Sequence, residues 1–73
     1  MRSARGVVTL AQEGRFKLAT DEGRVLHLML AHDAPLEPQD LAPLQHAQAR
    51  VRVEYEEVPQ LTAGLVRRLS EEA

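Results

Sequence analysis

The amino-acid sequence predicts a small all-β domain in which five short strands form a β-barrel and one short helix lies between the third and fourth strands. Three observations support this fold class. Short runs of β-branched and apolar residues recur along the chain, and glycine-containing turns separate the early runs. In two runs apolar and charged residues alternate, which is the period of a half-buried strand. The segment with helical spacing is short and begins just after two prolines.

The first three predicted strands form an antiparallel meander. They are GVVTLA (6–11), RFKLAT (15–20) and VLHLML (25–30), and a turn follows each of the first two. The second turn ends in Gly23 after two acidic residues, which is a strong hairpin signal. The third strand is apolar on both faces, so we expect it to be covered on both sides or to turn a corner of the barrel.

A short helix and two more strands complete the predicted domain. The segment 39–48 is predicted to be helical, with Asp40 as its N-cap and a narrow apolar stripe that begins at Leu41. The segment 50–57, RVRVEYEE, alternates apolar and charged residues and is predicted to be the fourth strand. After a loop with a proline and a glycine, the segment 65–69 is predicted to be the last strand.

The order β-β-β-α-β-β is that of a five-stranded OB-like barrel. The alternative is an SH3-like barrel, in which the helical stretch would be a single turn before one last strand. One domain is expected over residues 6–69. Residues 1–5 are predicted to be a disordered N-terminus and residues 70–73 a disordered acidic tail.

Composition restricts the classes of function. Nine Lys and Arg residues stand against eleven Asp and Glu residues, a formal net charge of -2, whereas non-specific nucleic-acid binders are usually basic. No apolar run approaches the roughly 18 residues of a membrane span, and MRSARG is not the start of a signal peptide. We therefore expect a cytoplasmic protein without a membrane partner.

Neither a catalytic site nor a cofactor is predicted. The chain has no cysteine, no Gly-x-Ser-x-Gly motif and no glycine-rich phosphate loop. His27, His32 and His46 lack the spacing of metal ligands. These absences favour a non-enzymatic protein with no bound metal.

The segment GVVTLAQEGRFKLATDEGR resembles the opening of bacterial translation initiation factor 1 and of the related S1-type domains. The matching positions are Gly6, Val8, Phe16, Leu18 and Gly23. The later ARVRVEYEEV, and Gly64 with the three residues after it, look like the fourth and fifth strands of that family. The chain also resembles short proteobacterial proteins of this general design. The resemblance implies an OB barrel that binds single-stranded nucleic acid, above all RNA.

The leading functional hypothesis is binding of single-stranded RNA or DNA through outward-facing cations. The ligand face of an OB barrel centres on its second and third strands. Arg15, Lys17 and Arg24 are predicted to meet there and to bind phosphate oxygens, and Arg52 and Arg67 on the last two strands extend the set.

An ordinary solvated sheet face competes with this hypothesis. Nearby carboxylates would then neutralise the cations in cross-strand pairs, and the candidates are Glu13, Glu54 and Glu56. Phe16 shares a face with Leu18, so it is expected to pack in the core, where it cannot stack on a base.

A second functional hypothesis is protein–protein association through the third strand. If Leu26, Leu28 and Leu30 fill the core, the other three residues of that strand face outward, and these are Val25, His27 and Met29. An exposed apolar patch often marks an interface. The partner would be another protein or a second copy of this chain.

Overall fold

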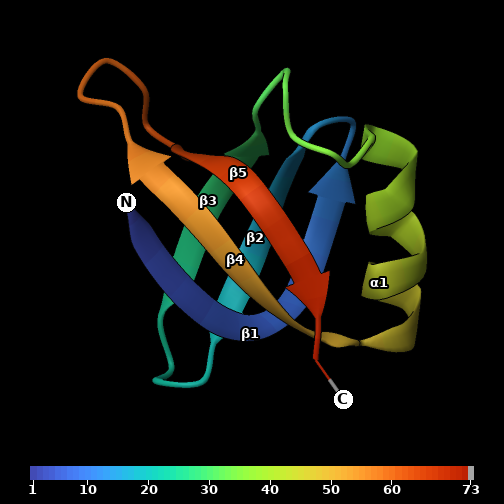
Figure 1. Ribbon diagram of the computed structural model, residues 1–73. Helices are drawn as coiled ribbons and strands as arrows, with labels where there is room; N and C mark the ends of the chain where they lie inside the picture. Colours follow the sequence, from blue (N-terminus) through green and yellow to red (C-terminus); the bar gives the residue numbers. More distant parts are fainter. Residues whose placement is uncertain (73) are drawn as a thin grey trace.

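The chain forms a closed five-stranded barrel in the computed structural model, which describes residues 1–72 (Figure 1). The strands are β1 (Arg2–Gln12), β2 (Arg15–Thr20), β3 (Val25–Leu30), β4 (Arg50–Glu57) and β5 (Gly64–Glu71). A single 3-10 turn, Pro38–Asp40, leads into α1 (Leu41–Ala47). The strands follow the order β1-β2-β3-β5-β4 around the barrel, and β3 and β5 are parallel. This arrangement confirms the OB-like fold class, and two strands after the helix exclude the SH3-like alternative.

The barrel uses more of both chain ends than the sequence predicts. β1 begins at Arg2 and pairs with β4 from Arg2 to Val7, so most of the segment expected to be disordered is strand. At the other end β5 reaches Glu71, and the N–H of Glu72 donates to the carbonyl of Arg50. Backbone pairing needs no apolar side chain, which is why a polar terminus can close a barrel without any hydrophobic signal. The last residue of the predicted tail, Ala73, lies outside the described residues.

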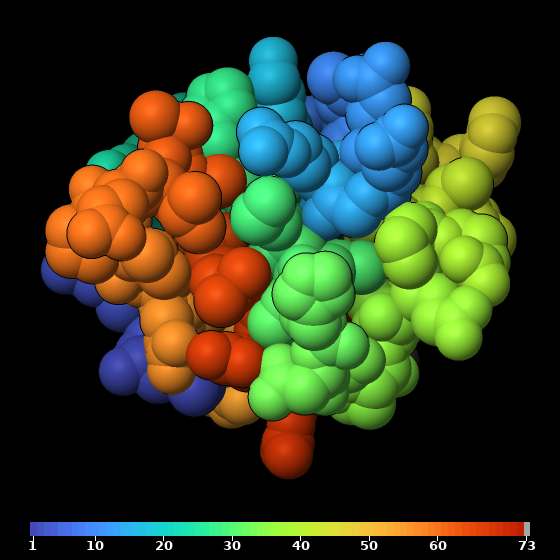
Figure 2. Space-filling view, turned by 90° about the horizontal axis from the view of Figure 1, so that it is seen from above, coloured from blue at the N-terminus to red at the C-terminus, as the bar shows by residue number. Residues whose placement is uncertain are grey.

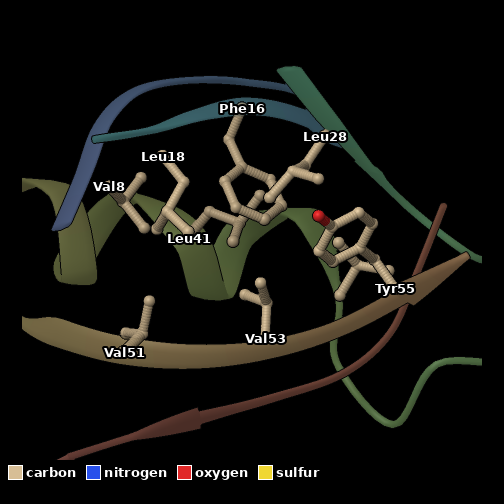
Figure 3. Packing of buried hydrophobic residues seen from close by; sticks show 9 residues of the cluster. Val8, Phe16, Leu18, Leu28, Leu41, Val51, Val53 and Tyr55 are labelled. Carbon is tan, nitrogen blue, oxygen red and sulfur yellow. The ribbon is translucent and has the colours of Figure 1, made fainter. Parts of the chain in front are cut away.

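One face of each strand fills the barrel. Phe16 is 3% exposed and Tyr55 is 8% exposed, and both lie among the aliphatic side chains of the core (Figure 3). The alternation predicted for β2 and β4 is therefore confirmed. Leu41 is fully buried, because α1 packs against β1 and places this first helical residue in the core.

Gly6 lies where the pairing of β1 passes from β4 to β2. β1 pairs with β4 over 2–7 and with β2 over 6–12, so Gly6 has a partner on both sides (Figure 1). A Cβ atom built on Gly6 would lie 2.8 Å from the carbonyl carbon of Ala19 and 2.8 Å from the Cα of Thr20. Both are backbone atoms that cannot rotate away, so this close approach requires glycine.

The second half of β1 is held by α1 instead of by β4. The side-chain oxygen of Gln45 accepts a hydrogen bond of 2.9 Å from the N–H of Ala11. The side-chain NH2 group of Gln45 donates a hydrogen bond of 3.4 Å to the carbonyl of Thr9. Between Val8 and Leu10 the register of β1 against β2 shifts, and Thr9 and Leu10 are both exposed. The side chain of Gln45 thus makes backbone hydrogen bonds that a neighbouring strand would otherwise make at this irregularity.

Replacing Gln45 with alanine is expected to lower the free energy of unfolding by about 1–2 kcal/mol, because the partly buried N–H of Ala11 loses its acceptor. Urea unfolding followed by circular dichroism measures the change. Gln12→Ala is the control, because Gln12 is exposed. Equal effects of the two substitutions would contradict the assigned role of Gln45.

Candidate nucleic-acid interface

The outer face of β2 and β3 carries two cross-strand rows of side chains. In one row Lys17 stands between Leu10 of β1 and His27 of β3. In the other, Arg15 stands between Gln12 of β1 and Met29 of β3. Since side chains alternate along a strand, both rows lie opposite the buried face of β2. Two cations of the first functional hypothesis, Arg15 and Lys17, therefore share one surface with His27 and Met29 of the second.

A shallow groove of about 340 Å³ lies over this surface. Arg15, Lys17 and His27 line it from the sheet, and Thr62 and Ala63 line it from the β4–β5 loop. Figure 2 looks onto the end of the barrel that carries both this loop, in orange, and the β1–β2 turn, in blue. The sequence pattern does not point to these loop residues, because only the barrel order brings them to the groove over β2.

Most cations of the chain are paired with carboxylates. Within residues 1–72 the ion pairs are Arg2–Glu57 at 3.2 Å, Arg5–Glu72 at 3.3 Å, Arg50–Asp21, Arg67–Asp33 at 2.7 Å, Arg67–Glu56 at 3.3 Å and Arg68–Glu54 at 4.0 Å. In this part of the chain Arg15, Lys17, Arg24 and Arg52 have no such partner.

The carboxylates expected to neutralise the β2 cations are used elsewhere. Glu54 and Glu56 pair with arginines of β5. Among the described residues, Glu13 forms no ion pair. A chain with a net charge of -2 can therefore still present two unpaired cations, Arg15 and Lys17, on one face.

Arg67 is held by two acids and does not join the groove. Its hydrogen bond to Glu56 and the charges of Asp33 and Glu56 raise the pKa of Arg67 above its ordinary value. It stays protonated, but its charge is offset by these two carboxylates. The prediction that Arg67 belongs with the β2 cations is therefore not supported by the geometry.

Arg24 and Arg52 lie apart from Arg15 and Lys17. Arg24 precedes β3 and lines a different hollow, together with Thr20 and Tyr55. The reason is alternation: even-numbered positions of β3 belong to the inner face, whereas the neighbours of Lys17 are odd-numbered. Arg52 lies on β4, across from Arg5 of β1. Arg24 is therefore not among the residues that line the groove with Arg15 and Lys17.

Both aromatic side chains of the protein, Phe16 and Tyr55, are buried, so neither offers a stacking platform. Among residues 1–72, no three His, Asp or Glu side chains converge as metal ligands would. No helix in this part of the chain is long and apolar enough to cross a membrane.

The fold and this groove together define a small OB-like barrel with a cationic outer face on β2. No protein-family model matches the chain, and no curated protein matches it significantly.

Proposed function

We propose that this protein is a non-enzymatic binding module that holds single-stranded nucleic acid, in the first place RNA, on the outer face of β2 and β3. The observation that carries the proposal is that Arg15 and Lys17 line the groove without a carboxylate partner among residues 1–72. Phosphates are the counter-charges that such cations bind. OB barrels use this face and its two flanking loops for oligonucleotides, and the resemblance to initiation factor 1 and S1-type domains points the same way.

Each groove residue has a role that suits its chemistry. Lys17 offers a compact charge to one phosphate, whereas the planar guanidinium of Arg15 can donate two parallel hydrogen bonds. The imidazole of His27 lies across from Lys17 and is exposed, so a base can stack on it. Gln12 and Thr62 are exposed at the rim and can donate to and accept from base edges.

The buried aromatic residues set the expected strength of binding. Each base stacked on an aromatic side chain contributes about 1–3 kcal/mol in single-strand binders. Since Phe16 and Tyr55 are in the core, phosphate contacts must supply most of the affinity. Binding is therefore expected to be modest and strongly salt-dependent.

An amide-shift titration of the labelled chain tests the proposal. The ligands are single-stranded RNA and DNA of about 12 nucleotides and mixed sequence, at low and at moderate salt. We expect shifts that cluster on Arg15, Lys17, His27 and Thr62 and that shrink as salt rises. Shifts confined to β4 and β5, or none at high ligand excess, would refute the proposed function.

A further inference from the structure

The first half of β3 has an open edge. Within the described chain, β2 pairs with the length of β3 on one side, but β5 pairs on the other side only over Leu28–Leu30. In an antiparallel ladder, alternate residues direct their backbone groups to the same partner strand. The N–H of Leu30 donates to Gly14, and the carbonyl of Arg24 accepts from Thr20, so even-numbered residues face β2.

The odd-numbered residues Val25 and His27 consequently direct their backbone groups away from β2. The N–H groups of Val25 and His27 and the carbonyl of Val25 lie before the β5 pairing begins, and in residues 1–72 no loop backbone or side chain bonds to them. Natural sheets usually protect such an edge with lysine, proline or a bulge. The segment 25–30 has none of these. The open edge is therefore available to another extended chain.

A groove lies along this edge, and its walls are mainly apolar. The groove has a volume of about 580 Å³ and lies between β3 and the β4–β5 loop. Val25 is 56% exposed and Leu61 is 41% exposed, and both line the groove together with Val58 and Pro59. The groove wall contains one acidic residue, Glu57, and no lysine or arginine. This lining suits apolar side chains and does not suit phosphates.

We propose that this groove is a docking site for an extended, apolar segment of a partner protein, which adds to β3 as an extra strand. Backbone groups of the partner would pair with Val25 and His27, which is the chemistry of β-strand addition. Its alternate side chains would pack against Val25 and Leu61. The groove adjoins the nucleic-acid groove and shares His27, Leu28, Thr62 and Ala63 with it. It lacks the two cations, Arg15 and Lys17, on which the proposed function rests, so the inference does not depend on that function.

The site is tested by selecting peptides that bind the chain and by measuring whether their affinity depends on the backbone N–H of Val25. A displayed library of random heptapeptides is selected on the full chain, and the enriched peptides are synthesised with capped ends. Their affinities are measured for the wild type, for Val25→Pro and for Val25→Thr. Proline removes the N–H at the first residue of a strand, where it is tolerated, whereas threonine keeps the N–H and the preference for strand. No nucleic acid is present in these measurements.

The proposal predicts apolar, strand-forming peptides whose affinity falls at least tenfold in Val25→Pro and less than threefold in Val25→Thr. If Val25→Pro does not fold, amide exchange of the wild type replaces it: the bound peptide should slow exchange at Val25 and His27 at least tenfold. Selected peptides that bind Val25→Pro as well as the wild type, or no enrichment at all, would overturn the proposal. A concentration-dependent dimer through this edge, or protection of these two amides by RNA, would also overturn it, because the occupant would be different.

Discussion

Replacing Gly6 with alanine is expected to lower the free energy of unfolding of the protein by about 3 kcal/mol. The new Cβ would lie 2.8 Å from two backbone atoms of β2, and β1 is held between two strands at this point, so it cannot move away. Overpacking of this kind costs about 3 kcal/mol or more. A domain of this size has a total stability of about 4–11 kcal/mol. Thermal unfolding followed by circular dichroism should show a loss of at least about 15 °C in Tm.

Gly14→Ala is the matched control for this prediction. The atom nearest to a Cβ on Gly14 is the Cγ of Pro38 at 3.9 Å, which is ordinary van der Waals contact. Its effect on the free energy of unfolding should stay within about 1 kcal/mol. If both alanine variants unfold at the same temperature, the close approach at Gly6 does not limit the barrel.

The double variant Arg15→Ala/Lys17→Ala is expected to lose most of the electrostatic part of RNA binding. Two phosphate contacts on a single strand correspond to a slope of about -1.4 in a plot of log K against log salt concentration. Wild-type affinity should therefore fall about sevenfold between 50 and 200 mM salt from these two contacts alone. In the double variant this share of the salt dependence should disappear. Fluorescence anisotropy with a labelled 12-nucleotide RNA measures both quantities.

The control is the double variant Arg2→Ala/Arg68→Ala, which changes the net charge by the same amount. Arg2 pairs with Glu57 and Arg68 pairs with Glu54 on the side of the barrel formed by β4 and β5. Its salt slope should match that of the wild type. A similar loss in both variants would show that only overall charge matters, and the groove would then not be the binding site.

The pattern of the chain was sufficient for the barrel itself. The alternation in β2 and β4 predicted which side chains are buried, including Phe16 and Tyr55, because period two is a local property of an extended chain. It also placed Arg15 and Lys17 on the outer face of β2. The strand ends were not predictable, since Arg2 and Glu71 are held by backbone pairing that leaves no trace in the side chains.

The choice among the cations was decided by the tertiary structure. From the sequence, Arg15, Lys17 and Arg24 were predicted to meet on one face, and Arg52 and Arg67 to extend this set. The closed barrel separates them in two ways. Two acids hold Arg67, whereas none in residues 1–72 pairs with Lys17. Arg24 and Arg52 also have no such partner, but they lie away from the groove.

The sequence by itself therefore determined the fold class and the two faces of each strand, because hydrophobic periodicity acts within a strand. Only the tertiary structure decided the functional surfaces. The barrel order brings Thr62 beside Lys17 and ends the pairing of β5 at Leu28, which leaves the edge at Val25 open. Both features depend on contacts between strands that are distant in the sequence. No local pattern of residues specifies at which residue two such strands stop pairing.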